Sequence, residues 1–426
     1  MREGRRWGLG LLAIVLLALL VRVVVVLTTP HYLPQTDSAD YDRIAASLAS
    51  AHKFPDSQLS LTPGPTAFRG PLFPLALSLV YKISGVLPPS TRWEAGRLLE
   101  AVLGAITVAL IGLIARRLLG ARVALLAAAI AAIYPALVLV GSSLMSEAIY
   151  IPLLLAAVLA ALVAREHREG WGWAAVAGVL VGLVALTRPN GIALVVPLGL
   201  LVWTRRPLRS WRSLRAPVLV VAAALLTLVP WTVRNLHEFG ELVPVSTESG
   251  YATVGEFNRF TAARTDFPAL WTPPIGEMVS IRGQIRTLNE AQLSDRLNTI
   301  AVDYARQHPK YVARALLWNT IRELGLSGTG FELSIAGLEA YPRYLVSLSV
   351  YSFWVLGLLA LGGALTAAAR RVPWALWGCP LVILLSAVPI IGATRYRAPA
   401  DPFLILLAAL ALVALSGIRR RPAGAR

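Results

Sequence analysis

The chain has 426 residues, of which 56% are hydrophobic and only 15% charged, and its mean hydropathy is +0.65. This composition excludes a single soluble domain and indicates repeated membrane-spanning runs. The formal net charge of +17 does not indicate nucleic-acid binding, because the basic residues gather in short clusters between apolar runs, where cytoplasmic loops carry them. The single cysteine, Cys379, excludes an intrachain disulfide and a cysteine metal site.

The first apolar run, Leu9 to Leu27, follows a basic N-terminus. It is long enough to span a bilayer and no small-residue cleavage site follows it, so we interpret it as an uncleaved first helix rather than a signal peptide. Arg22 interrupts its outer third. We expect this long side chain to extend to the membrane interface.

The next segment, residues 28–94, is predicted to lie outside the membrane. It opens on an acidic cluster, Asp37-Ser38-Ala39-Asp40-Tyr41. We expect two short helices along the membrane surface, Ala39 to Ala51 and Pro71 to Leu87, joined by the turn-forming stretch Thr62-Pro63-Gly64-Pro65. Carboxylates at the mouth of a helix bundle indicate chemistry on a membrane-borne substrate.

Further spanning candidates follow in chain order. They run roughly from Arg97 to Ala115, Val123 to Val140, Ala148 to Ala164, Trp173 to Leu186, Ile192 to Trp203, Pro217 to Trp231, Val346 to Ala369, Trp374 to Ile391 and Phe403 to Ile418. With the first helix they predict an all-α polytopic membrane protein with about ten crossings.

Basic clusters set the orientation of these crossings. They are Arg116-Arg117 with Arg122, Arg165 with Arg168, Arg205 through Arg215, Arg370-Arg371 and Arg419-Arg420-Arg421. The positive-inside rule places them, and both termini, in the cytoplasm. Counting Pro71 to Leu87 as a crossing would move most of these clusters to the outer face, so we interpret that segment as interfacial or re-entrant.

The runs divide the chain into an N-terminal transmembrane module, residues 1–231, an outer segment, 232–345, and C-terminal transmembrane helices, 346–426. Within the outer segment, Asn289 to Leu324 carries apolar residues at helical spacing. This pattern predicts two amphipathic helices broken near His308-Pro309.

Conspicuous polar residues of the outer connections fall on one side of this topology. They are Asp37, Asp40, Arg69, Ser146-Glu147, Thr187-Arg188-Pro189-Asn190, Arg234-Asn235 and Arg395-Tyr396-Arg397. A guanidinium presents a planar fork of donors suited to phosphate oxygens, and a carboxylate can take a proton from a hydroxyl or hold a divalent cation. The set suits transfer of a group from a lipid phosphate to an acceptor hydroxyl.

Each of these residues also has a structural explanation. Arginines at helix ends commonly anchor a helix at the interface, and Glu147 could begin a helix, where an acid complements the dipole. Asp37 and Asp40 could cap the helix they introduce. The sequence has no metal-binding histidine spacing, Gly-rich phosphate loop or nucleophilic triad motif.

Several motifs follow the first helix in a recognisable order. They are the loop acid Asp37, then Thr66-Ala67-Phe68-Arg69-Gly70-Pro71-Leu72-Phe73-Pro74, Ser143-Leu144-Met145-Ser146-Glu147, Leu186-Thr187-Arg188-Pro189-Asn190 and Pro230-Trp231-Thr232-Val233-Arg234-Asn235. Together they resemble the C-type integral membrane glycosyltransferases. More narrowly, the chain looks like the bacterial relatives of dolichyl-phosphate-mannose protein mannosyltransferases and of the lipid A aminoarabinose transferases.

The resemblance implies roles for the carboxylates. Asp37 matches the first-loop acid that deprotonates the acceptor hydroxyl for direct displacement at the anomeric carbon. Glu147 matches the second acidic position, which supports the donor site or a divalent cation, and Asp40 is a further candidate ligand for that cation.

The resemblance also implies a donor-phosphate site formed by Arg69 with Arg395, Tyr396 and Arg397, to which we add Arg188 and Arg234 as weaker candidates. The double proline usual after the loop arginine is here Gly70-Pro71, and the outer segment is too small for a large accessory module. These departures leave the acceptor open.

The resulting prediction is an inverting glycosyltransferase of the cytoplasmic membrane, surrounded by membrane lipids and with its active site on the outer face. It would move a sugar from a polyprenyl-phosphate donor to a hydroxyl of a protein, lipid or envelope glycan. The alternative is a lipid-linked saccharide flippase or another transporter, but transporter sites lie near the bilayer midplane and often between duplicated halves, and no duplication is visible. A membrane scaffold would explain the bundle but not Asp37.

Overall fold

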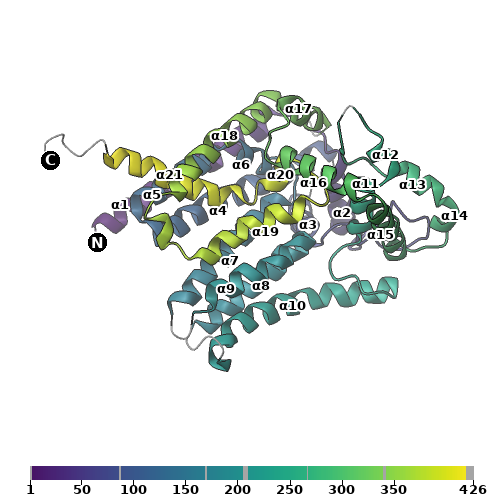
Figure 1. Cartoon of the computed structure of the whole chain (residues 1–426), viewed down its shortest axis with the longest axis horizontal. Coiled ribbons are helices and arrows are strands. Elements are labelled where there is room, and N and C mark those ends of the chain that lie inside the picture. The colour runs from purple at the N-terminus through teal and green to yellow at the C-terminus, as the bar shows by residue number, and fades with distance from the viewer. Residues whose placement is uncertain are drawn as a thin grey trace.

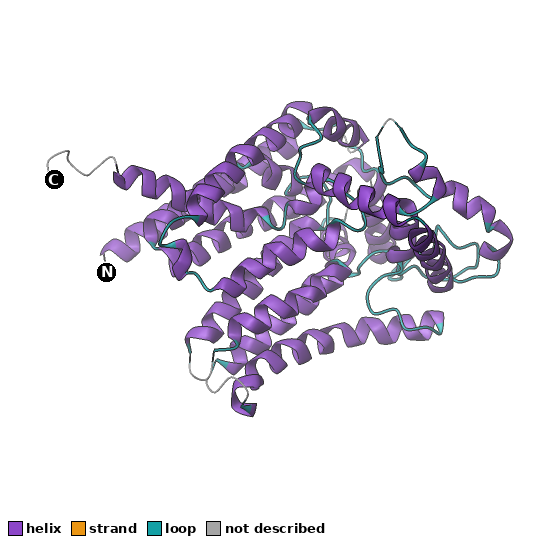
Figure 2. Cartoon of the chain, in the orientation of Figure 1, coloured by secondary structure: helices purple, strands orange, loops and turns teal. Residues whose placement is uncertain are grey.

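The computed structural model describes residues 2–85, 88–167, 170–204, 210–265, 267–338 and 342–418. Throughout these ranges the regular structure is helical, with an isolated antiparallel bridge between Asp56 and Pro65 and no strand (Figure 2). Among the described helices, 5 are long and apolar enough to cross a membrane. They are α1 (Arg2–Thr28), α4 (Pro89–Leu119), α7 (Glu147–Glu166), α10 (Trp211–Phe239) and α18 (Arg343–Ala364). The chain is therefore an all-helical, multi-pass membrane protein.

Shorter helices, most of them apolar, complete the bundle. They are α5 (Ala121–Ile133), α6 (Pro135–Val140), α8 (Trp171–Thr187), η1 (Pro189–Leu194) with α9 (Val195–Val202), η2 (Ala369–Arg371), η3 (Trp374–Trp377) with α19 (Gly378–Ala387), and α21 (Asp401–Ile418). The prediction of about ten crossings counts several of these helices as spans, and that number stays a prediction.

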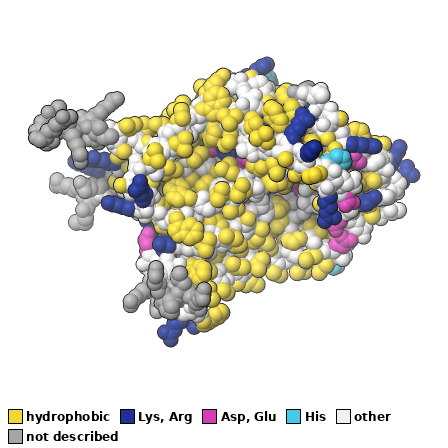
Figure 3. Space-filling view, in the orientation of Figure 1, with side chains coloured by type: hydrophobic (Ala, Val, Ile, Leu, Met, Phe, Trp, Pro, Cys, Tyr) yellow, Lys and Arg dark blue, Asp and Glu magenta, His cyan; other side chains and the backbone are white. Residues whose placement is uncertain are grey.

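The molecule is elongated along the helices. The beginning of α1 and the end of α21 lie at one end, and the helices of the outer segment lie at the other (Figure 1). A broad hydrophobic surface separates charged side chains at the two ends (Figure 3). This arrangement agrees with termini on one side of a membrane, although the clusters at residues 205–209 and 419–421 lie outside the described residues.

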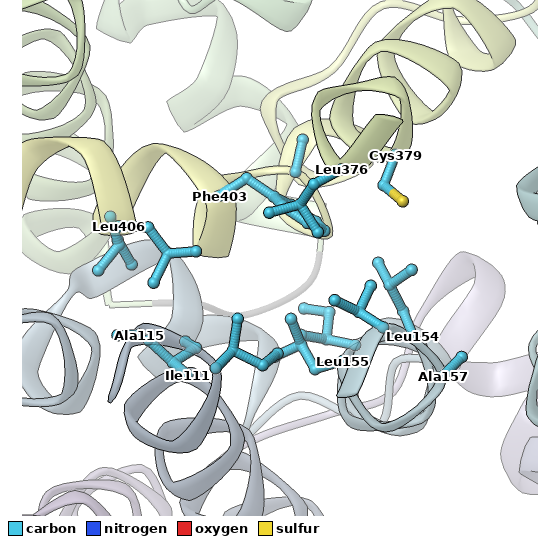
Figure 4. Packing of buried hydrophobic residues seen from close by; sticks show 14 of the residues in the cluster. Ile111, Ala115, Leu154, Leu155, Ala157, Leu376, Cys379, Phe403 and Leu406 are labelled. Carbon is cyan, nitrogen blue, oxygen red and sulfur yellow. The ribbon is translucent and has the colours of Figure 1, made fainter. Parts of the chain in front are cut away.

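The core of the bundle is rich in small apolar residues. Ile111 and Ala115 of α4, Leu154 of α7, Phe403 of α21 and the fully buried Cys379 belong to one hydrophobic cluster (Figure 4). Alanines line most of the buried face of α5. Small side chains let helices approach closely, which is how helices associate in a membrane without a hydrophobic driving force between them.

Arg22 corrects a prediction. Its side chain does not extend to the interface but is fully buried, and its guanidinium donates to the carbonyl oxygens of Ala132 and Leu137, both at 3.2 Å. These carbonyls flank the break between α5 and α6, where Pro135 interrupts the helical hydrogen bonds. A Cβ at Gly104 would lie 2.3 Å from the Arg22 Nε, so that glycine makes room for the arginine. Carbonyl oxygens inside the bundle, beside the break, therefore bind the guanidinium in place of the interface.

The two predicted surface helices are α2 (Thr36–Ala51) and α3 (Leu72–Ile83). α3 has 12 residues and is about 18 Å long, well short of the roughly 30 Å of a hydrocarbon core. Its length agrees with the prediction that this segment does not cross, although residues 86–87 of the predicted range lie outside the described residues.

The outer segment is helical, as expected. Its helices are α11 (Glu248–Glu256), α12 (Arg259–Ala262), α13 (Ile275–Ser280), α14 (Arg282–Ile285), α15 (Glu290–Gln307), α16 (Pro309–Glu323) and α17 (Thr329–Leu338). The predicted break at His308-Pro309 separates α15 from α16 and is confirmed. α10 continues to Phe239, so the predicted boundary at residue 231 falls inside a helix.

Single cysteines can test the topology. In a Cys379→Ala background, we expect cysteines placed at Gly64 and at Ser90 to react with a membrane-impermeant thiol reagent from the same, outer face, because α3 lies between them and is too short to cross. A cysteine at Ala121, at the opposite end of α4, is the control and should react from the cytoplasmic face. Labelling of positions 64 and 90 from opposite faces would overturn this topology.

Candidate functional site

Asp37 and Asp40 share one face of α2. They are three residues apart, which places them together on the helix surface. The N-cap of α2 is Gln35, whose side chain forms a capping box with Ser38, so capping does not explain either acid. Both carboxylates are free to make contacts beyond their own helix.

Arg69 is the first of these contacts. It follows the loop that leads to α3, and only 7% of its side chain is exposed. Its Nη2 lies 2.6 Å from Asp37 Oδ1 and 2.9 Å from Asp40 Oδ2, and its Nη1 lies 2.5 Å from Glu248 Oε1. Arg69 therefore forms three ion pairs, and the one with Glu248 joins the first outer loop to the outer segment.

Arg395 joins the same acid from the C-terminal part of the chain. It lies on the short helix α20 (Thr394–Arg397) and forms an ion pair with Asp37 through Nη2, which also donates to the Tyr396 hydroxyl at 3.0 Å. Its Nε lies 3.6 Å from Glu147 Oε1. Asp37 is thus held between two guanidinium groups from distant parts of the sequence.

Glu147 begins α7 and is almost fully buried. The guanidinium of Arg188 lies 2.8 Å from its Oε1, and the Arg188 Nε donates to Ser146 Oγ at 2.8 Å. Glu147 therefore lies between Arg188 and Arg395. We call the whole set the ion-pair cluster: Asp37, Asp40, Arg69, Glu147, Arg188, Glu248 and Arg395.

The arginines and burial act on the carboxylates in opposite directions. Burial alone would raise the pKa of Asp37, but the guanidinium groups of Arg69 and Arg395 hold that pKa well below its usual range. Burial raises the pKa of Glu248, and Arg69 opposes that shift without cancelling it. Asp37 is consequently ionised at any working pH and forms ion pairs with two guanidinium groups.

Two predicted residues lie elsewhere. Arg397 is buried, forms an ion pair with Asp401 at 3.2 Å and donates to the Glu323 carbonyl at 2.8 Å. Arg234 donates to Asn235 Oδ1 at 2.9 Å and lies over the Trp231 ring. The structure therefore gives Arg397 and Arg234 packing contacts and does not bring them into the ion-pair cluster.

The predicted cation ligands do not form a metal site here. Asp40 pairs with Arg69, whereas Glu147 pairs with Arg188 and Arg395. The described part of the chain has no group of three or more His, Cys, Asp or Glu side chains suited to a metal ion. Divalent cations take several oxygen ligands, so these residues do not fit one, and no step below uses a metal.

Glu248 and Glu290 were not predicted from the sequence. Both stand in the first turn of a helix, where an acid needs no explanation beyond the helix dipole. Glu290 accepts hydrogen bonds from Thr66 Oγ1, the Ala67 amide and Thr247 Oγ1, each at 2.7 Å. These partners come shortly before Arg69 and directly before Glu248, so Glu290 fixes both sides of that ion pair.

We expect Glu290→Gln to destabilise the protein. An amide nitrogen cannot accept, so at least one buried donor among the three partners loses its bond, at a cost of about 1–3 kcal/mol. Thermal unfolding in detergent measures this loss. The control is Glu166→Gln, which removes an exposed ion pair with Arg117 that is worth about 1 kcal/mol or less. Equal effects of the two substitutions would contradict a clamping role for Glu290.

Residues 68–233 match the family model described as dolichyl-phosphate-mannose-protein mannosyltransferase. The matched segment is similar to that family of membrane glycosyltransferases and covers less than half of the chain. The match confirms the resemblance seen in the sequence, and it spans Arg69, Glu147 and Arg188 of the ion-pair cluster. Comparison with curated protein sequences gives no significant match.

Solved structures share the fold of this chain. The oligosaccharyltransferase AglB from Archaeoglobus fulgidus, solved with an inhibitory peptide and a dolichol-phosphate, superimposes with a TM-score of 0.57 at 15% identity, over 98% of this chain and 52% of that chain. The Archaeoglobus fulgidus oligosaccharyltransferase with Zn and sulfate gives 0.56 at 15% identity, over 95% and 49%. The chain thus spans about half the length of these archaeal proteins.

ArnT from Cupriavidus metallidurans, solved with undecaprenyl phosphate, gives a TM-score of 0.42 at 17% identity, over 95% of this chain and 77% of that chain. At the identities found, likeness to the archaeal structures establishes the fold alone.

Proposed function

We propose that this protein transfers a sugar from a polyprenyl-phosphate donor to an acceptor hydroxyl, at the outer face of the cytoplasmic membrane and with inversion at the anomeric carbon. The observation that carries this proposal is the ion-pair cluster, in which three arginines surround Asp37 and Glu147. Guanidinium groups suit a phosphate leaving group, and a carboxylate suits proton removal. The family match and the dolichol-phosphate bound to the archaeal relative support a lipid-phosphate donor.

In the free protein, Asp37 is a weak base because Arg69 and Arg395 both hold it. The donor phosphate is an anion and competes for the same guanidinium groups. As those groups turn to the phosphate, Asp37 loses its partners and gains basicity. Donor binding would therefore produce the active base, so Asp37 becomes basic only when the donor is bound.

The chemical step then balances as follows. Asp37 takes the proton of the acceptor hydroxyl while the acceptor oxygen forms a bond to the anomeric carbon. The bond between that carbon and the phosphate oxygen breaks, and its electron pair stays on the polyprenyl phosphate. The leaving phosphate gains a negative charge, which Arg395, Arg188 and Arg69 stabilise in a site largely closed to water.

The test uses the full chain, purified and returned to lipid vesicles with a panel of polyprenyl-phosphate sugars. Release of polyprenyl phosphate, with transfer to an acceptor or to water, is the expected result. Movement of intact donor across the vesicle membrane without release would instead favour the flippase. Neither release nor movement with any donor in the panel would contradict both functions.

A further inference from the structure

A buried acid in α4 takes no part in the chemistry proposed above. Glu100 is fully buried, and its carboxylate accepts hydrogen bonds from three successive backbone amides. Oε2 accepts from Ser143 and from Leu144, both at 2.7 Å, and Oε1 accepts from Met145 at 2.6 Å. A buried carboxylate is costly unless it is paired or fully hydrogen-bonded, and here backbone amides supply the bonds.

These three amides belong to the loop between α6 and α7, which has a strained conformation. Leu144 has φ +53°, a left-handed value that a leucine rarely adopts. α4 also supplies Arg97, whose Nε donates to the Ser142 carbonyl at 2.7 Å, and the Tyr32 hydroxyl donates to the Ser143 carbonyl at 2.5 Å. The surroundings thus impose the shape of this loop.

The loop leads directly into the ion-pair cluster. Ser146 accepts hydrogen bonds from Arg188 Nε at 2.8 Å and from the Tyr41 hydroxyl at 3.0 Å. Glu147 follows, between Arg188 and Arg395. The position of the three amides therefore decides where the carboxylate that the two arginines share can lie.

We infer that Glu100 is a positioning residue for the donor site: by holding the 143–145 amides it places Glu147, and through Glu147 it orients Arg188 and Arg395 toward the donor phosphate. This inference rests on the proposed function. Strained backbone that is held by its surroundings is common at functional sites. Glu100 binds the amides of this loop and, in the described part of the chain, forms no ion pair with a member of the cluster, so it acts through the loop.

The test is a double-mutant cycle between Glu100 and Glu147, measured as donor KM and kcat. Glu100→Gln keeps the shape but presents an amide nitrogen to backbone donors, so we expect the donor KM to rise about tenfold, with less change in kcat. Glu147→Gln should give a similar rise. Because both changes act through one carboxylate, the double variant should be no worse than Glu147→Gln alone. If the rises in donor KM of the two single variants multiply in the double variant, the inference is wrong.

The control is Glu94→Gln, which lies on the same helix but is exposed, and it should leave donor KM unchanged. If Glu100→Gln does not fold, Tyr32→Phe replaces it, because it removes the hydrogen bond to the Ser143 carbonyl and keeps the aromatic ring. A smaller rise in KM, again absent in the Glu147→Gln background, is expected. The inference is wrong if Tyr32→Phe does not raise the donor KM, or if its effect multiplies with that of Glu147→Gln.

Hydrogen exchange of the 143–145 amides separates this inference from the proposed function, because it needs no donor. Exchange should be faster in the Glu100 variant, or in Tyr32→Phe if that replaces it, than in the parent protein. If exchange is faster in the variant but the parent protein releases no polyprenyl phosphate, the proposed function is wrong and the role of Glu100 in holding the loop stands. Unchanged exchange would contradict this role of Glu100 even if the parent protein is active.

Discussion

Asp37→Asn is expected to lower kcat for sugar transfer by about a hundredfold or more while the protein folds, inserts and binds donor. Asparagine has nearly the shape of aspartate but cannot take the proton of the acceptor hydroxyl. The substitution also removes the anion that occupies Arg69 and Arg395. Donor affinity should therefore stay the same or increase, which a binding titration with polyprenyl-phosphate sugar can measure.

The two readouts separate the roles of Asp37. Transfer near the parent rate would rule out Asp37 as the base and direct attention to Asp40 or Glu147. Weaker donor binding would contradict competition between donor phosphate and Asp37 for the same arginines.

The pH profile of the parent protein gives a third check on Asp37. Because the arginines depress the pKa of Asp37 in the free protein, its acid limb in kcat/KM should fall below the usual aspartate range, whereas the limb in kcat should lie at higher pH.

Arg395→Lys is expected to raise the donor KM by about tenfold or more, and Arg395→Ala by more than that. The arginine uses different nitrogens toward Asp37 and Glu147, and a lysine has a single donor atom that cannot reproduce this planar fork. Steady-state kinetics with varied donor measure the effect.

Arg92→Lys is the matched control. Arg92 is as exposed as Arg395, at 20% against 19%, and its Nη2 lies 2.6 Å from Asp42 in an ion pair outside the cluster. Its substitution should leave the donor KM unchanged. Equal KM values for Arg395→Lys and the parent would remove Arg395 from the donor site.

The sequence predicted the helical class because lipid imposes it: a spanning segment must satisfy its own backbone hydrogen bonds, so long apolar runs become helices. The break at His308-Pro309 was predictable because proline lacks an amide hydrogen. Which short helices cross was harder to predict, since α8, α9 and α19 are apolar but shorter than a full span.

The cluster residues could be proposed from sequence because the topology places their loops on one face. Their partners could not, because an ion pair such as Arg395 with Asp37 depends on packing between distant segments. The same reason explains the arginines that were misplaced. Arg22 and Arg397 look like interfacial or ligand-binding residues until Ala132 and Asp401 are seen beside them. Glu100 gave no signal, since one acid in an apolar helix does not reveal which loop it binds.

The bonds of Glu290 bear on how proteins of this kind can diverge. An outer segment joined to the rest of the protein only through its chain ends could be exchanged between relatives, as surface modules are. Here the start of α15 and the residue before α11 are bound to Thr66 and Ala67 of the loop that carries Arg69. A chimera that imports a foreign outer segment must therefore import a compatible residue 66–67 pair as well. Under the proposed function, exchange of the outer segment would therefore also disturb the loop that carries Arg69.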